Sequence, residues 1–168
     1  MAKLSGKRNG DLFVRTGNSE SVKVENTLFH PSYELEFSLL YLNEKMGQPI
    51  CLNTLDFSTE MDAHHFKSIG FNRKNLAHFN PKSEKVWVKK RKEFLTALES
   101  TRKDVSVCLK YVGGPLIYQD PKTDVTSLVG ISLWQLPLKC RQFTATRIEI
   151  QYQDISQIKD WIKEKMSE

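Results

Sequence analysis

The chain of 168 residues has the length of one domain and is long enough to bury a substantial core. Its hydrophobic fraction of 39% and charged fraction of 27% exclude an intrinsically disordered protein, and no apolar run approaches the roughly 20 residues of a membrane span. The net charge of +5 mildly favours anionic partners. Because the N-terminus also lacks the apolar core of a signal peptide, we expect a protein of the cytoplasm or nucleus that is not secreted and has no transmembrane segment.

The N-terminal region is expected to begin with a tail and continue into strands. Residues 1–10 are basic and polar, so they are predicted to form the tail, and residues 11–168 to form a single domain. Leu12–Val14 and Ser21–Phe29 are rich in strand formers, and hydrophobic and charged residues alternate in the second run. These two runs predict a pair of strands.

Helices dominate the predicted middle of the chain. Leucines recur at helical spacing between Pro31 and Gly47, which suit a helix start and a helix end, although alternation over the same residues leaves a strand as the alternative. After a short strand within residues 48–57, further helical segments are expected over residues 58–70 and 72–79, where capping residues and glycine mark the ends.

A long amphipathic helix is predicted from about Pro81 to Lys103, and the rest of the chain is expected to be organised around it. At about 100° per residue, Trp87, Arg91 and Leu95 fall on one face, which is expected to pack into the core. Basic residues gather on or near the opposite face, diluted by three glutamates. The expected basic surface consists of six lysines of the helix and two basic residues that precede it in the sequence: Lys82, Lys85, Lys89, Lys90, Lys92, Lys103, Arg73 and Lys74.

The second half of the chain predicts an antiparallel meander of about four strands. Alternation and turn signals place these strands within residues 105–111, 116–118, 125–136 and 143–153. A final helix is expected after Asp154, whose side chain can cap it. The fold class is therefore predicted to be α+β: a single domain with a helical middle segment and a meander backed by a C-terminal helix.

The cysteines favour a reducing compartment. Cys51, Cys108 and Cys140 are odd in number, widely spaced and form no C-x-x-C pair. This pattern is typical of reduced, mostly buried thiols and not of a disulfide framework.

A histidine cluster is the first alternative candidate site. The cluster contains aspartate and histidine, two residue types that bind metals, in Asp62, His64, His65 and His78. Asn75 lies three residues before the last histidine. The set loosely resembles the site of the ββα-metal (HNH) nucleases. Those sites lie on a hairpin followed by a helix, whereas this segment is expected to be helical, so the resemblance identifies no family. We predict no metal site and leave open whether folding brings the four residues together.

A second alternative is acidic. Asp120, Asp124 and Glu149 distantly resemble the carboxylates of metal-dependent restriction-type nucleases, in which neighbouring strands hold Mg²⁺. In those enzymes a lysine normally stands two residues after the glutamate, and here that position is Gln151. Asp120 also lies in an Asp-Pro turn, which explains it without a metal.

The leading functional prediction is a non-enzymatic protein that binds nucleic acid or another polyanion through the basic helix face. No catalytic residue and no cofactor are predicted, because the phosphate-loop, dinucleotide-binding, G-x-S-x-G and H-E-x-x-H patterns are absent. The alternatives are a metal-dependent nuclease or hydrolase, and a scaffold or matrix-like assembly protein that meets acidic partners or an anionic membrane. A protein partner or a homo-oligomer also stays open.

Overall fold

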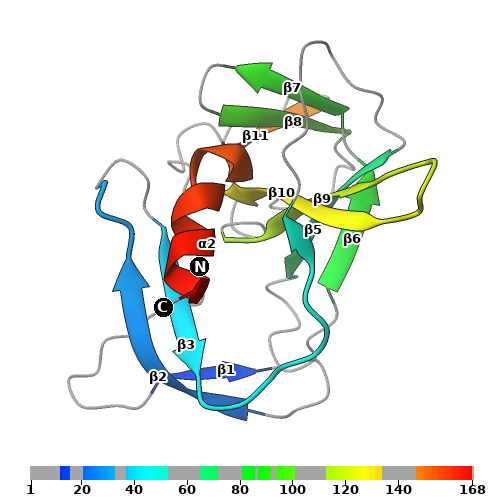
Figure 1. Ribbon diagram of the computed structural model, residues 1–168. Helices are drawn as coiled ribbons and strands as arrows, with labels where there is room; N and C mark the ends of the chain where they lie inside the picture. The colour runs from blue at the N-terminus through cyan, green and yellow to red at the C-terminus, as the bar shows by residue number, and fades with distance from the viewer. Residues whose placement is uncertain are drawn as a thin grey trace. The chain divides into compact units, whose positions relative to one another are not determined.

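A computed structural model of the chain is shown in Figure 1. It describes residues 12–15, 21–32, 37–52, 65–71, 81–85, 87–91, 94–100, 113–133 and 147–167. The chain divides into two compact units, residues 1–49 and residues 50–168. Both are built on antiparallel sheets, and the protein is mostly β. The predicted tail, residues 1–10, lies outside the described residues.

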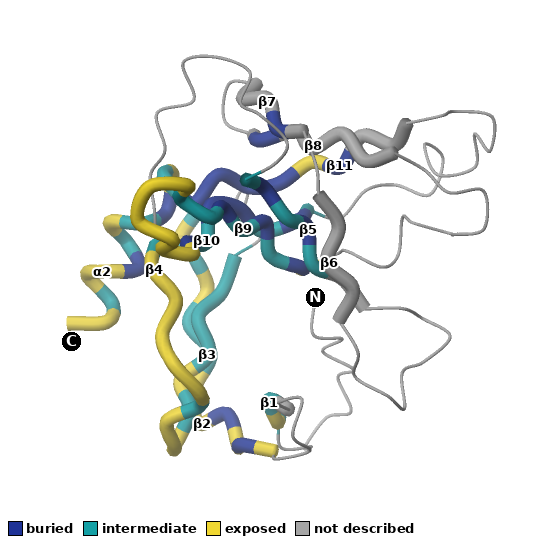
Figure 2. The backbone as a smooth tube through the Cα atoms, turned by 90° about the vertical axis from the view of Figure 1, so that its right-hand side faces the viewer, coloured by how far each residue is buried: buried dark blue, intermediate teal, exposed yellow. Residues whose placement is uncertain are grey.

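The first unit contains a three-stranded antiparallel sheet in the order β1-β2-β3. Its strands are β1 (Phe13–Arg15), β2 (Ser21–Phe29) and β3 (Ser38–Leu42). The two predicted N-terminal strands are confirmed, and Val22 and Val24 are buried while their neighbours in β2 are exposed, as Figure 2 shows. The helix expected between Pro31 and Gly47 is wrong at 38–42, because these leucines pair with β2 instead.

The second unit contains a larger sheet of eight strands. Its strands are β4 (Cys51–Leu52), β5 (Phe66–Phe71), β6 (Pro81–Lys85), β7 (Trp87–Arg91), β8 (Phe94–Ser100), β9 (Pro115–Gln119), β10 (Thr126–Ser132) and β11 (Arg147–Asp154). The hydrogen-bonded order is β6-β5-β9-β10-β11-β8-β7, and β4 adds a short parallel pairing to β10.

The order of this sheet returns to its starting point through the chain. Its first strand, β6, and its last strand, β7, are separated in sequence by residue 86 alone. β6 pairs with β5, and β7 pairs with β8. Within the described residues, β5 and β8 therefore each have a partner strand on both sides.

The core of the second unit lies on one face of this sheet. Phe66, Leu95, Leu116 and Tyr152 are fully buried there, and Ile150 is nearly so. Figure 2 shows the buried backbone gathering where β5, β9 and β10 run together. A β-bulge between Leu128 and Gly130 changes the register of β10, and the neighbouring strands come very close to the glycine.

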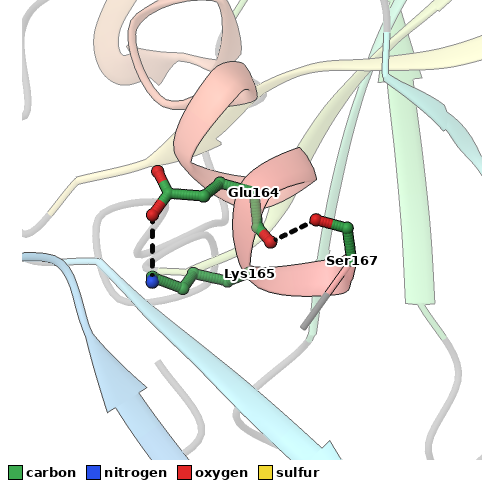
Figure 3. Close-up of polar contacts among 3 residues, drawn as sticks. All are labelled: Glu164, Lys165 and Ser167. Carbon is green, nitrogen blue, oxygen red and sulfur yellow. Dashed lines mark hydrogen bonds and ion pairs between the residues drawn. The ribbon is translucent and has the colours of Figure 1, made fainter.

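The C-terminal segment follows the prediction. The Oδ1 atom of Asp154 accepts a hydrogen bond from the backbone N–H of Ser156 at 2.8 Å and caps a short 3₁₀ turn, η5 (Ile155–Gln157). The helix α2 (Lys159–Ser167) follows and buries Ile162. Near its end the Nζ atom of Lys165 lies 3.0 Å from Glu164 Oε1, and Ser167 Oγ donates to the Glu164 carbonyl (Figure 3). In the ranges given above, the structure holds no helix long and apolar enough to cross a membrane.

The predicted helical middle is wrong, and with it the predicted fold class. Residues 81–85, 87–91 and 94–100 form β6, β7 and β8 where one helix was expected. The last part of the predicted 58–70 helix is also a strand, β5, whereas residues 72–79 lie outside the described residues. Lysine, glutamate and leucine favour helices in isolation, but pairing with two neighbouring strands overrides that preference.

Candidate polyanion interface

The long strand 81–91 has two faces that differ in character. In an antiparallel pair, residues opposite each other share a face, and successive residues alternate between faces. Val88 is fully buried and lies opposite Ala97, next to the fully buried Leu95. In the first half of the strand, Glu84 lies opposite the buried Ser68. By register, the even-numbered positions of β6 and of β7 therefore fall on the core face.

The odd-numbered positions of β6 and β7 fall on the opposite face by register, and three of them are basic residues in the sequence. We call this set the basic stripe: Lys85, Trp87, Lys89 and Arg91 on the strand itself, with Lys67 on β5. Lys67 lies directly opposite Lys85 and is half-buried. On the β8 side, Lys89 lies opposite Thr96, which in turn lies opposite the exposed Gln151 of β11.

Two lysines in direct cross-strand register are unfavourable on their own. Like charges at such positions repel, because their Cβ atoms lie only about 5 Å apart. Lys67 Nζ donates to Gln119 Oε1 at 3.3 Å, and the Gln119 amide in turn donates to Asp124 Oδ1. The lysine is thus held by an amide oxygen, which leaves its full positive charge in place. An anion bound beside Lys67 and Lys85 would relieve their repulsion.

The turn between β9 and β10 is shaped by acidic side chains. Asp120 Oδ1 accepts hydrogen bonds from the backbone N–H groups of Lys122 at 2.7 Å and Thr123 at 3.2 Å, and these bonds lower the pKa of the Asp120 carboxyl. Burial, and then the Asp120 charge, raise the pKa of the Tyr118 hydroxyl. The carboxylates of Asp120 and Asp124 therefore serve the turn, as the sequence suggested for Asp120.

The predicted basic residues are dispersed. Lys85 and Lys89 occupy the stripe, but Lys82 and Lys90 fall on the core face by register, opposite Gly70 and Leu95. The predicted helix face that would have grouped them is absent from β6 and β7. Successive residues of a strand alternate between its two faces, whereas residues three or four apart share a face in a helix. The other predicted members, Lys92, Lys103, Arg73 and Lys74, lie outside the described residues.

Among the described residues, neither the histidine candidates nor the acidic candidates form a group of three that could hold a metal ion. His65 packs its ring edge-on against Tyr118, with centroids 6.2 Å apart, whereas Asp62, His64 and His78 lie outside the described residues. Glu149 is on β11 opposite Leu98. Within the part of the chain that the structure describes, no three histidine, cysteine or acidic residues form a group that could hold a metal ion. Cys51 is a free thiol and is exposed, whereas Cys108 and Cys140 lie outside the described residues.

A buried polar pair holds the centre of the second unit. Ser68 Oγ and Tyr152 Oη lie 2.6 Å apart, and both side chains are fully buried. Burial raises the pKa of Tyr152 to about 12, although the hydrogen bond with Ser68 opposes the rise. The pair ties β5 to β11 across the core face.

Comparison with known proteins finds a likeness of fold. No family model matches the chain, and no curated protein does. Among solved structures the chain is similar to kallikrein-related peptidase 10, with a TM-score of 0.59 and 15% sequence identity over 94% of this chain and 79% of that chain. The fold is chymotrypsin-like. Folds of that type are built from β-barrels, which agrees with the mostly antiparallel sheets described above.

Sequence reasoning missed three members of the stripe. Helical periodicity placed Trp87 and Arg91 on the core side, and Lys67 was assigned to a different helix. A period of two over residues 85–91 would have grouped Lys85, Trp87, Lys89 and Arg91 correctly. That signal was available, but charged residues at positions 82, 84 and 90 hid the apolar half of the alternation.

Proposed function

We propose that this protein is a non-enzymatic binding protein that holds a polyanion along the basic stripe. The observation that carries the proposal is the strand register, which sets Lys85, Lys89 and Arg91 on the face opposite Val88 and puts Lys67 beside Lys85. Positions two apart on a strand are separated by about 6.6 Å, so the stripe from Lys85 to Arg91 spans about 20 Å. Four cations over that length suit a chain of phosphates better than a single anion.

The net charge supports the same partner class. An excess of +5 over the whole chain draws polyanions in by long-range attraction, which salt screens. Contacts of this kind are sequence-neutral, because they address the phosphate backbone and not the bases. For four cations that each neutralise one phosphate of a single strand, the logarithm of the association constant falls with the logarithm of salt concentration at a slope of about −3.

The experiment is a salt titration of binding with a charge-reversed variant. A fluorescent 20-nucleotide oligonucleotide is titrated with wild-type protein and with the Lys85→Glu/Lys89→Glu variant at several salt concentrations. We expect the variant to bind at least tenfold more weakly and the slope to become shallower by about 1.4, because two phosphate contacts are lost.

A matched control separates the stripe from net charge. Lys122 lies in the β9–β10 turn and Lys163 on α2, and both are exposed. The Lys122→Glu/Lys163→Glu variant makes the same change in total charge at other places. Equal weakening by the two variants, or binding that ignores salt, would refute the proposal. Adding Mg²⁺ or Mn²⁺ and examining the oligonucleotide for cleavage tests the metal-dependent nuclease alternative in the same samples.

The fold likeness favours one second candidate, peptide hydrolysis, because the similar solved structure is named as a peptidase. A serine nucleophile of that kind needs a histidine base within hydrogen-bond reach. Labelling the protein with a fluorophosphonate probe tests this directly, since the probe reacts only with an activated serine. Stoichiometric labelling would establish an enzyme, and we expect none.

A further inference from the structure

We propose that two copies of this chain associate through β3, which pairs antiparallel with the same strand of the second copy along its outer edge. The inference goes beyond the proposed function and does not depend on it. It starts from the sheet of the first unit, in which β2 lies in the centre and β3 pairs with β2 alone among the described strands. A strand at such an edge presents a row of backbone groups to any chain that can pair with them.

The hydrogen-bond pattern of β3 defines which backbone groups point outward. The backbone N–H of His30 donates to the Phe37 carbonyl at 2.9 Å, so these opposite residues form a hydrogen-bonded pair of the antiparallel ladder. Because such pairs alternate along a ladder, every second residue after Phe37 directs its N–H and C=O groups toward β2. The residues between them, Ser38, Leu40 and Leu42, direct these groups to the outer edge.

The outward groups of β3 are complementary to a second copy of themselves. When the two strands run antiparallel with Leu40 opposite Leu40 of the second copy, Ser38 lies opposite the second copy's Leu42, and each outward N–H and C=O meets a partner. Any other antiparallel register pairs fewer of these residues. The arrangement has a twofold axis at Leu40 and uses the outer edge of β3 in both copies, so the association closes as a dimer.

The side chains of β3 suit the same arrangement. The strand reads Ser-Leu-Leu-Tyr-Leu, so it holds neither a charge that would repel its copy nor a proline that would protect the edge. Leu39 lies opposite Tyr41 of the second copy in a non-hydrogen-bonded pair, where side chains approach most closely. Leu39 is half-buried and Tyr41 is 37% exposed, so both have apolar surface left to bury.

An exposed aromatic residue beside the edge supports the same partner. Phe29 lies opposite Ser38 and is 66% exposed. In the dimer, Leu42 of the second copy lies on the far side of Ser38 in the same cross-strand row, so only a small side chain separates the ring from an apolar neighbour. The association therefore covers aromatic surface that a single chain leaves in water.

The test is sedimentation velocity of the full chain at concentrations from about 5 to about 500 μM, because an interface of this small size gives a weak dimer. Leu40→Lys and Leu40→Glu each place like charges directly opposite one another across the twofold axis. We expect the wild type to pass from monomer to dimer as its concentration rises, and each variant alone to stay monomeric. An equimolar mixture of the two variants should dimerise again, because the opposed charges then attract.

A matched control and a second measurement on the wild type complete the test. Met166 is 76% exposed on α2, so Met166→Lys makes the same kind of change away from β3 and should leave the dimer intact. The N–H of Leu40 bonds only in the dimer, so its hydrogen exchange should slow at least about fivefold across the concentration series. This measurement decides the matter without any variant having to fold.

The contrary results are equally definite. A wild type that stays monomeric throughout, grows beyond a dimer, or shows unchanged exchange at Leu40 overturns the proposal. So does a dimer that either Leu40 variant forms alone, or a mixture of the two that stays monomeric. None of these results bears on the basic stripe, so polyanion binding stands or falls by its own salt titration.

Discussion

The buried pair of Ser68 and Tyr152 gives the most direct test of the fold. Phe in place of Tyr152 removes one hydroxyl, Ala in place of Ser68 removes the other, and the double variant removes both. Each single variant leaves a buried hydroxyl without its partner at 2.6 Å, in a place where both side chains have no exposed surface. A double-mutant cycle therefore measures the interaction itself.

The magnitudes follow from burial. A hydrogen bond contributes about 0.5–1.5 kcal/mol net, and a buried hydroxyl left unpaired costs about 1–3 kcal/mol. We expect each single variant to lose about 2 kcal/mol and the double variant to lose less than the two losses combined, with a coupling of about 1–2 kcal/mol. For a chain of this length, 2 kcal/mol corresponds to a fall in Tm of roughly 4–8 °C.

Alkaline pH provides a second measurement on the same residue. Burial raises the pKa of Tyr152 from its ordinary 10.0 to about 12. Between these two pKa values the native state keeps a proton that the unfolded chain releases. The contribution of Tyr152 to the free energy of unfolding is therefore complete below pH 10 and is lost as the pH rises to 12. A shift of this size corresponds to roughly 2–3 kcal/mol. Urea unfolding between pH 9 and pH 12 should show this loss in the wild type and not in Tyr152→Phe. Additive costs in the cycle, together with equal alkaline profiles, would refute the placement of β5 against β11.

Three further predictions test other parts of the second unit. Gly130→Ala should cost about 1–3 kcal/mol, since a Cβ there would lie 3.0 Å from Tyr152 Cβ and 3.2 Å from the Gln153 carbonyl, neither of which can move alone; thermal unfolding checks this. Gln153→Met should stabilise the protein by about 1 kcal/mol, because the Gln153 side chain is 2% exposed and neither of its amide atoms has a hydrogen-bond partner among the described residues; a loss of stability in urea would show that the amide is bonded in solution. Backbone N–H donors lower the pKa of Asp120 in the folded protein. Its contribution to the free energy of unfolding is therefore present above the pKa of the unfolded chain and is lost as the pH falls through the lowered pKa of the folded state. Asp120→Ala should abolish this acid-dependent part of the stability, and NMR titration of the carboxyl measures the pKa directly.

The C-terminal half of the fold could be predicted because its local signals agree with its pairing. Alternation predicted strands that the structure shows as β9, β10 and β11, and the Asp120–Asp124 turn joins the first two. The cap at Asp154 marked the start of the last helical segment. In these segments sequence period, turn chemistry and tertiary partners all specify the same structure.

The middle of the chain could not be predicted for a physical reason. Between residues 82 and 100 there is no glycine or proline to break a helix, and Trp87, Arg91 and Leu95 recur every four residues. The alternation is visible in the sequence only around Val88, because charged residues (Lys82, Glu84 and Lys90) occupy the register positions that share a face with that buried valine. Pairing with β5 and β8 decides that the stretch follows the period of a strand. The other partners of these two strands, β9 and β11, lie far away in sequence.

The pairing of β6 and β7 connects the missed fold to the proposed function. Without residues 81–91, β5 would have only β9 beside it and β8 only β11, so both strands would present open edges that invite association with other chains. A helix at this position could not supply the missing hydrogen bonds, whereas β6 supplies them to β5 and β7 supplies them to β8. Once the stretch is a strand, its period of two necessarily separates Val88 from Lys85, Trp87 and Lys89. The same requirement that closes the sheet therefore assembles the basic stripe, and the stripe should persist only as long as the closure does.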